Sequence, residues 1–580
     1  MTSRSTMSGK ADDFARVRDI IRRHARELDK PGVIAVRPGY VFRDGWISTA
    51  PAIVPIVVKK KDLAELRPGD ILPSQIEGVE VDVAPATPLE QLSSQSVNQF
   101  IETVASHPAA ANEAAMAGSV IPAELKLAIA EASRTGRYRP PPDVQLNQVT
   151  DAMTVTCHVS PDAGWPTLKD FLGKIDQKIT IAMYDFSAPH ILERLRSSLE
   201  RSRAELSLIL DPGIAAGTGE GASVKSRDVT EEKVVTTLEG LLKTRFHFTW
   251  AGVKRDGKTD SSIFPSAYHI KMAVIDSAKF WVSSGNWQSS NQPDIEPLRP
   301  DADRTDILRN YNREWHVIVE HPALARTYEQ FIDWDIAQAK PLQVHPKAMS
   351  LPPLIAPAWL FPRLMEADTG PPRYFVPTTL QFPRGRPLNV MPLLTPDNYA
   401  EHILHAIQGA KAKIYFQNQY INIGKQRDEQ FDALLEALVL KKSAGLDVRI
   451  ILRDLPNSRK MLEDMQNYGF DMSCVKLQPN SHTKGIVVDS EILVLGSHNW
   501  SNEGTLYNRD ASVMFFDSQI ARYYEEVFLY DWDALARAKT GFESGMPWVN
   551  HAMGESAPET QTPRLLHQEV VVPWSTFYED

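Results

Sequence analysis

The chain has 580 residues, a formal net charge of −10, and an ordinary globular composition of 43% hydrophobic and 23% charged residues, so we expect a soluble protein with more than one core. The negative net charge argues against extensive, sequence-independent binding of nucleic acid, because such binding needs a basic surface. Its two cysteines are too few for a disulfide framework or a zinc-binding set.

The first 145 residues are predicted to form a separate small α/β domain of unknown role. Residues 12–29 have an amphipathic helical pattern, and the strand-like runs GVIAVRPGYVF, AIVPIVVKK and GVEVDVAPA follow it. The Pro-rich run at 137–143 marks the boundary of this domain. No catalytic constellation is recognisable within it.

Neither a secretory signal nor a membrane span is visible in the sequence. The N-terminus lacks an apolar signal core, and the longest apolar stretch, Leu354 to Phe361, is far shorter than the roughly 20 residues of a spanning helix. We therefore expect a cytoplasmic protein without a transmembrane segment.

Residues 146–339 alternate between helical and strand-like patterns. Amphipathic helices are predicted at 164–177, 189–203 and 231–242, and each precedes a short apolar strand. Three further strands, HIKMAVID, KFWVSSGNW and EWHVIVE, lead to a helix over 322–338. This alternation favours a sheet with helices on its faces.

The same order of elements restarts in residues 396–540, which indicates an internal repeat. Between the two halves, residues 340–395 are Pro-rich and are predicted to be an irregular linker or insertion. The last segment, 541–580, is Pro-rich and polar and is predicted to be a weakly structured tail.

One motif occurs in both halves at identical spacing. The residue types His, Lys, Asp, Ser and Asn stand at relative positions 0, +2, +7, +15 and +17 in each copy, and coincidence explains such a repeat poorly. The members are His269, Lys271, Asp276, Ser284 and Asn286 in the first half, and His482, Lys484, Asp489, Ser497 and Asn499 in the second.

Strand geometry assigns different roles to these residues. Side chains alternate faces along a strand, so each His shares a face with its Lys, and this pair suits an anionic phosphate. The aspartates at +7, Asp276 and Asp489, fall on the opposite face and are expected to brace the strand end. Glu314 and Asp510, which follow an Asn-Arg pair in each half, are better candidates for orienting the histidines.

The doubled motif resembles that of the phospholipase D superfamily, over roughly 165–338 and 396–537. The run YFQNQYI also resembles a segment of family members that act on lipids, whereas the Asn-Trp after each motif Ser resembles nuclease-like members. The first motif departs from the family pattern at Ser283, where the family has Gly, so the first half-site is expected to be tighter or reshaped. The resemblance implies a duplicated α/β double domain, with two mixed sheets flanked by helices and related by a pseudo-two-fold axis.

The resemblance also implies a metal-free, cofactor-free, two-step displacement through a phosphohistidine. By analogy with the family, His269 is the expected nucleophile and His482 the general acid and base, although the pseudo-symmetry makes the two nearly interchangeable. The motif lysines and asparagines would stabilise the phosphate oxygens. The motif serines, Ser284 and Ser497, are expected to support the site, and they either bind phosphate or satisfy a turn. We interpret His190, His247 and His316 as ordinary side chains without partners.

Several functions fit this reading. The leading prediction is a phosphodiester hydrolase that releases phosphatidic acid from phospholipids, with peripheral membrane contact. The alternatives are a nuclease on the same scaffold, a phosphatidyltransferase, and a catalytically silent module that only binds a phosphodiester. The partner is thus a phospholipid or a nucleic acid, and the oligomeric state stays open.

Overall fold

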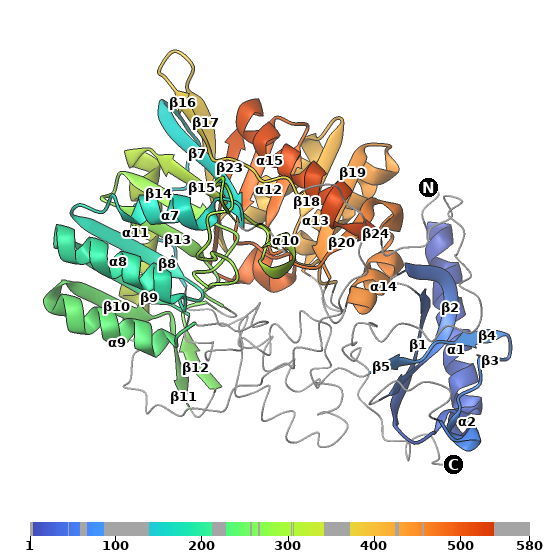
Figure 1. Cartoon of the computed structure of the whole chain (residues 1–580). Helices are drawn as coiled ribbons and strands as arrows, with labels where there is room; N and C mark the ends of the chain where they lie inside the picture. The colour runs from blue at the N-terminus through green and yellow to red at the C-terminus, as the bar shows by residue number, and fades with distance from the viewer. Residues whose placement is uncertain are drawn as a thin grey trace.

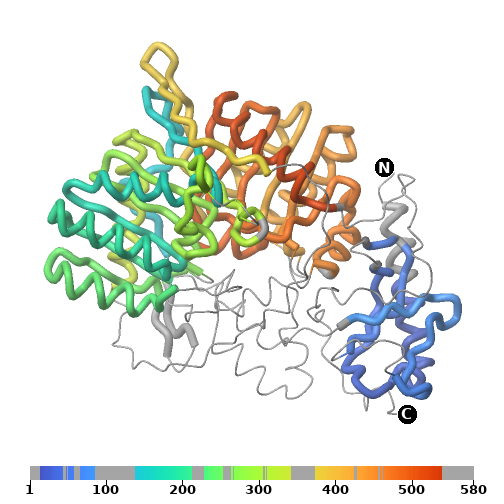
Figure 2. The backbone as a smooth tube through the Cα atoms, in the orientation of Figure 1, coloured from blue at the N-terminus to red at the C-terminus, as the bar shows by residue number. Residues whose placement is uncertain are grey.

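The computed structural model describes residues 4–43, 46–57, 66–85, 138–211, 228–255, 258–264, 267–302, 304, 307–340, 372–423, 428–454 and 458–538. The predicted tail at 541–580, and residues 341–371 of the predicted linker, lie outside these ranges. Figures 1 and 2 show the two halves of the repeat side by side, with the N-terminal elements beyond the second half.

The first half is built on a mixed sheet that has eight strands within the described ranges. Strands β8, β9 and β10 pair in parallel and the others pair antiparallel. In order across the sheet, the strands are β10 (Phe246–Trp250), β9 (Glu205–Leu210), β8 (Lys178–Met183), β13 (Lys271–Ile275), β14 (Lys279–Ser283), β15 (Glu314–Glu320), β7 (Met153–Ser160) and β16 (Thr378–Phe382).

The second half repeats this topology, which confirms the predicted duplication. Its sheet has nine strands in the described part of the chain. In order, they are β24 (Arg537–Ala538), β20 (Val475–Gln478), β19 (Asp447–Arg453), β18 (Lys413–Gln417), β21 (Gly485–Val488), β22 (Ile492–Gly496), β23 (Asp510–Phe516), β17 (Leu388–Thr395) and β6 (Val149–Asp151). The seven strands from β20 to β17 follow the same order as those from β10 to β7.

Apolar side chains on both faces of the central strands divide the molecule into layers. In β13, Met272 and Val274 join a core shared by both halves, whereas Ala273 and Ile275 join the outer core of the first half. The shared core also contains helices α11 (Pro322–Ala339) and α15 (Ser518–Tyr530). The outer helices are α7 (Gly164–Leu172), α8 (Pro189–Ser202) and α9 (Glu231–Leu242) in the first half, and α12 (Tyr399–Gly409), α13 (Glu429–Ser443) and α14 (Ser458–Tyr468) in the second.

The prediction of an irregular linker over 340–395 is wrong for its last part, which forms the two strands β16 and β17. Strand β16 extends the first sheet, while β17 belongs to the second sheet at the position that β7 holds in the first. The prolines hid this arrangement: Pro392 lies beyond the part of β17 that β6 covers, where a strand edge tolerates proline.

The described part of the N-terminal region is a small sheet with one long helix, and it docks on α14. Helix α1 (Arg4–Arg23) packs against β1 (Val33–Arg43) and β2 (Trp46–Val57), and the short strands β3 (Gln75–Ile76), β4 (Val79–Val81) and β5 (Ala84–Pro85) complete the sheet. Buried ion pairs join Arg37 to Glu463 at 3.0 Å and Arg459 to Asp82 at 2.5 Å. Among the described helices, none is long and apolar enough to cross a membrane.

Candidate active site between the two halves

The two motif histidines lie at the interface of the halves, each two residues before the motif lysine at the end of a central strand. Lys271 begins β13 and Lys484 immediately precedes β21. Both histidines are buried, with exposed fractions of 5% for His269 and 0% for His482. The repeat therefore brings two imidazoles into one buried region.

Each histidine is paired with a carboxylate from the opposite half. His269 Nδ1 lies 2.8 Å from Asp510 Oδ1, and His482 Nδ1 lies 2.6 Å from Glu314 Oε1. Backbone contacts across the interface fix one of these pairs, because the His482 amide donates to the Arg313 carbonyl at 3.1 Å, one residue before Glu314. A complete site therefore needs both halves.

Buried charges set the protonation of these pairs. Burial alone would raise the pKa of Asp510, but His269 lowers it to about 2, so this carboxylate is ionised and accepts the Nδ1 proton. The charge of His482 and its hydrogen bond likewise lower the pKa of Glu314 against the opposing effect of burial. Burial and the Lys271 charge lower the pKa of His269. A neutral His269 that donates from Nδ1 keeps the lone pair of Nε2 for chemistry.

The motif serines hold the carboxylates in place. Ser284 Oγ donates to Glu314 Oε2 at 2.6 Å, and Ser497 Oγ donates to Asp510 Oδ1 at 2.5 Å. The sequence predicted a supporting role for these serines, through a phosphate contact or a turn, and it did not predict how close they lie to the acids. Each serine therefore holds the carboxylate that pairs with a motif histidine.

Cationic and amide side chains surround the histidines. Lys484 Nζ lies 3.0 Å from His482 Nε2, and Lys271 Nζ donates to the His269 carbonyl at 2.7 Å. Asn286 and Asn499 are buried, and Oδ1 of each has no hydrogen-bond partner among the described residues. Polar atoms of this kind are normally satisfied, so these two amides are suited to a polar substrate.

The motif aspartates lie at the far ends of the same strands. Asp276 accepts backbone N–H groups of Gln177 and Lys178 at 2.8 and 2.9 Å, and Asp489 accepts those of Ala412 and Lys413 at 2.8 Å each. Both have positive φ, 54° and 53°. They brace turns and make no contact with the paired histidines.

Ser283, the departure from the family motif, contacts the buried imidazole of His316. This ring lies between two hydroxyl groups, an arrangement that we call an imidazole bracket. Ser283 Oγ lies 2.7 Å from Nδ1 of His316, and Ser160 Oγ lies 2.8 Å from Nε2 of the same ring. Burial lowers the pKa of His316 well below its ordinary value, so this ring is neutral. The expectation that His316 lacks partners is wrong, because its partners come from strands distant in sequence.

The second half has the same bracket with its parts exchanged. Here the ring belongs to His498, whose Nδ1 lies 2.7 Å from Ser512 Oγ and whose Nε2 lies 2.6 Å from Thr395 Oγ1. Ser512 stands at the repeat position of His316. A Cβ on Gly496, the counterpart of Ser283, would lie 2.1 Å from Ser512 Oγ. The first half accepts Ser283 because its imidazole arrives from the neighbouring strand.

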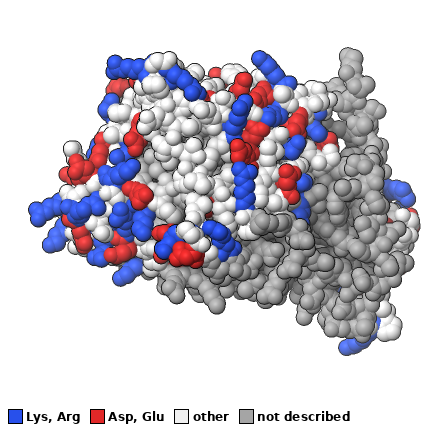
Figure 3. Space-filling view, turned by 45° about the horizontal axis from the view of Figure 1, so that its top comes forward, with Lys and Arg blue, Asp and Glu red and all other residues white. Residues whose placement is uncertain are grey.

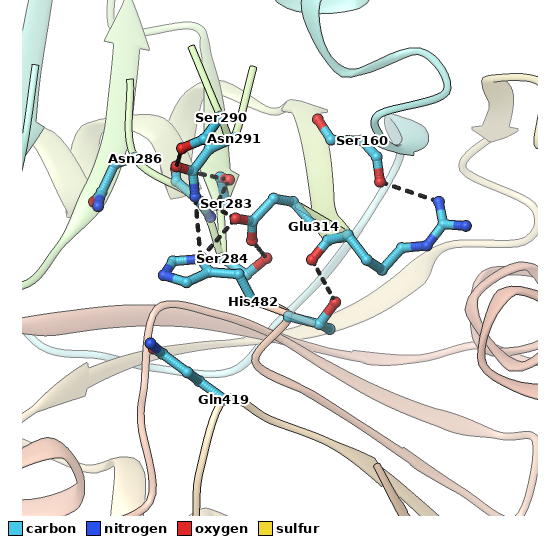
Figure 4. A network of polar contacts seen from close by, with 12 residues as sticks. Ser160, Ser283, Ser284, Asn286, Ser290, Asn291, Glu314, Gln419 and His482 are labelled. Atoms are coloured by element: carbon cyan, nitrogen blue, oxygen red, sulfur yellow. Dashed lines mark hydrogen bonds and ion pairs between the residues drawn. The ribbon is translucent and has the colours of Figure 1, made fainter. Parts of the chain in front are cut away.

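Sequence reasoning missed Asn291, which touches the His482 pair. Its Nδ2 donates to Glu314 Oε1 in a short hydrogen bond and lies 3.2 Å from His482 Nδ1 (Figure 4). The repeat counterpart of Asn291 is Gly504. A search for residues shared by both halves therefore could not find it.

Two side chains that follow the equivalent strands β8 and β18 also distinguish the half-sites. The ring of Tyr184 packs edge-on against His269, with 4.7 Å between ring centroids, and Lys271 Nζ lies 4.9 Å from the Tyr184 ring centroid. Gln419 stands at the same repeat position in the second half, and Figure 4 shows its amide pointing toward the His482 ring.

Comparisons with known proteins point to one group of enzymes. The family model described as "Cardiolipin synthase, PLD-like domain" matches residues 403–532. Cardiolipin synthase A of Pseudomonas entomophila is 25% identical over 228 residues, 38% of this chain and 40% of that protein. Cardiolipin synthase A of Pseudomonas fluorescens is 26% identical over 283 residues, 48% of this chain and 49% of that protein. The chain therefore spans less than half the length of these curated relatives.

Two solved structures also match parts of the chain. Phosphatidylserine synthase of Haemophilus influenzae matches with a TM-score of 0.43 and 11% identity, over 71% of this chain and 91% of that one. The phospholipase D family member Nuc of Salmonella typhimurium matches with a TM-score of 0.22 and 23% identity, over 26% of this chain and 95% of that one.

Proposed function

This chain belongs to the phospholipase D superfamily, and on that premise we propose that it is a phosphatidyltransferase that works through a phosphohistidine. The observation that carries the proposal is the pair of buried histidines, each held by a carboxylate from the opposite half. In this proposal, one imidazole attacks phosphorus, and the other donates a proton to the leaving alcohol and accepts one from the entering alcohol.

In the first step, Nε2 of His269 attacks phosphorus and forms the P–N bond. The P–O bond to the leaving alcohol breaks, and protonated His482 gives that oxygen its proton. In the second step, an incoming alcohol gives its proton to His482 and attacks phosphorus, the P–N bond breaks, and His269 is restored. The lowered pKa of His269 supports its role as the nucleophile, because only the neutral ring can attack.

The non-bridging oxygens of the phosphate carry negative charge throughout both steps. Lys271 and Lys484 supply fixed positive charge beside the histidines, and the amide N–H groups of the buried Asn286 and Asn499 can donate to the same oxygens. Groups that are already oriented before the reaction stabilise developing charge without reorganisation.

Two observations favour transfer to an alcohol over the hydrolysis that the sequence led us to expect. The matched relatives are named cardiolipin synthases. The reacting side chains are also deeply buried, and exclusion of water protects a reactive intermediate from hydrolysis. Figure 3 shows basic and acidic side chains interspersed on the described part of the face that it draws, a pattern that does not favour broad electrostatic binding of nucleic acid.

The test is to incubate the protein with phosphatidylglycerol vesicles in the presence of EDTA and to identify the lipid products. We expect cardiolipin and free glycerol from the wild type and from His405→Ala, an exposed histidine of α12 that serves as the matched control. His482→Ala should form neither product.

Three other outcomes would replace the proposal. Release of phosphatidic acid without cardiolipin would make the protein a hydrolase, and cleavage of DNA or RNA in place of lipid would make it a nuclease. If neither lipid, nucleic acid nor bis(p-nitrophenyl) phosphate were turned over, the site would serve binding alone.

A further inference from the structure

We propose that Gln419 forms the subsite for the leaving and entering alcohol, and that this subsite accepts a neutral polyol hydroxyl. The inference rests on the proposed function, in which His482 handles the proton of the alcohol. It adds the residue that binds the alcohol and the chemical class of alcohol that fits.

The position of Gln419 places it on the alcohol side of the site. Strand β18 ends where Gln417 pairs with Gly485, and Gln419 lies two residues further along, beside the segment that carries His482. Its repeat counterpart, Tyr184, touches His269 directly. In Figure 4 the Gln419 side chain reaches from its strand end toward the His482 ring.

The Gln419 side chain is buried and does not use all its hydrogen-bonding capacity, while its backbone is fixed. The side chain is only 3% exposed, and its Oε1 has no hydrogen-bond partner among the described residues. The backbone is fixed, because the Gln419 carbonyl accepts the Arg453 amide at 3.1 Å and its own amide donates to Asn418 Oδ1 at 2.8 Å. A buried amide atom without a partner is normally explained by something that it binds.

The charges near His482 select a hydroxyl over an ammonium group. Glu314 is the carboxylate of this side, and both of its oxygens are engaged, Oε1 by His482 and Asn291 and Oε2 by Ser284. Lys484 adds a positive charge 3.0 Å from His482 Nε2, which repels a second cation. A primary amide both donates and accepts hydrogen bonds, as a hydroxyl does.

The first half offers the opposite chemistry. Asp185, the counterpart of Tyr420, is a buried carboxylate whose Oδ1 has no partner among the described residues, while its Oδ2 accepts Gln288 Nε2 at 2.5 Å. A carboxylate of this kind would suit an ammonium alcohol. It follows Tyr184, which packs against His269, however, and the alcohol leaves in line, on the side of phosphorus away from the nucleophile. Substitutions of Gln419 and Asp185 therefore distinguish an alcohol bound beside His482 from an alcohol bound beside His269.

The experiment measures incorporation of radiolabelled glycerol into phosphatidylglycerol vesicles, with release of phosphatidic acid as the competing transfer to water. Gln419→Met keeps the side-chain length and removes the hydrogen bonds. We expect it to raise the glycerol concentration for half-maximal incorporation about tenfold, while release of phosphatidic acid changes less than about twofold. Asp185→Asn, the matched variant on the other side, should leave the glycerol dependence unchanged.

A gain of function provides a second readout that misfolding cannot produce. Gln419→Glu should raise the ratio of ethanolamine to glycerol incorporation, because it adds an unpaired carboxylate on the alcohol side. The inference is overturned if Asp185→Asn shifts the glycerol dependence and Gln419→Met does not, or if Gln419→Met lowers both transfers equally. Wild-type protein that transfers phosphatidyl groups to neither glycerol nor water would instead refute the proposed function.

Discussion

The two half-sites share one skeleton but differ in the residues built around it. Both present a histidine, a lysine, an asparagine and a serine-held carboxylate at matching positions. They differ at Tyr184 and Gln419, at Asp185 and Tyr420, and at Asn291 and Gly504. The shared groups are those that a phosphate requires from either side. In the proposed mechanism, the differing groups lie on opposite sides of phosphorus, so we expect them to govern substrate recognition and the division of roles between the histidines.

The supporting brackets diverged in a compensated way. His316 of the first half and His498 of the second each lie between two hydroxyl groups, although His316 belongs to β15 and His498 to the segment that follows β22. A neutral buried imidazole can use one nitrogen as donor and the other as acceptor, so two hydroxyls satisfy it completely. Each half therefore retains an imidazole between two hydroxyl groups, although different segments of the repeat supply the ring.

The largest expected effect tests which histidine is the nucleophile. We expect His269→Ala and His482→Ala each to lower turnover of phosphatidylglycerol by about 10⁵-fold or more, because residues that act as a unit are each indispensable. Only His482→Ala should accumulate a covalent adduct with bis(p-nitrophenyl) phosphate, since its leaving group needs no acid. Mass spectrometry of the intact protein checks this, and an adduct in His269→Ala instead would exchange the two roles.

The two carboxylates that pair with the histidines, Asp510 and Glu314, should show the same division between the two reaction steps, with smaller losses of activity. Asp510→Asn and Glu314→Gln keep the shape of each pair but reverse one hydrogen bond, and we expect each to lower kcat by about 10³- to 10⁴-fold, as for other histidine-orienting acids. Asp510→Asn should slow the burst of p-nitrophenol, while Glu314→Gln should keep the burst and slow the steady state. Stopped-flow absorbance separates the two phases. Equal loss of the burst in both variants would contradict the assigned roles.

The sequence could reveal what the halves share. The motif offsets predicted the paired histidines, lysines and asparagines, and strand alternation separated Asp276 and Asp489 from Glu314 and Asp510. The repeated order of elements predicted the duplicated fold. Each of these inferences depends on local spacing, which one chain displays twice.

Features that depend on one half alone, or on pairing between distant strands, could not be found in this way. Asn291 has a glycine as its counterpart, so the repeat conceals it. Strand β17 is defined by its pairing with β23, more than 100 residues later, and its prolines predicted a linker instead. The contact between Ser283 and His316 likewise requires the register of β14 and β15.

The exchanged brackets predict unequal tolerance at Ser283 and Gly496. A Cβ on Gly496 would lie 2.1 Å from Ser512 Oγ and 2.2 Å from the Ala511 carbonyl, so we expect Gly496→Ala to lower the free energy of unfolding by about 1–3 kcal/mol or more. Ser283→Gly removes a hydroxyl from His316 and should cost about 1–2 kcal/mol. Urea titrations compare the two variants. A larger loss for Ser283→Gly would mean that the brackets are not equivalent.

The smallest expected effect concerns Asn291, which supports only the His482 pair. Its amide donates to Glu314 Oε1, and removal of one such hydrogen bond to a charged group should lower kcat about tenfold. Asn291→Ala should leave the p-nitrophenol burst intact, because His269 and Asp510 do not contact this side chain. Asn389→Ala, in the part of β17 that pairs with β6, is the matched control and should change neither phase. If Asn291→Ala slowed the burst as much as the steady state, Asn291 would serve the whole interface, and the division of labour between the half-sites would not extend to their supporting residues.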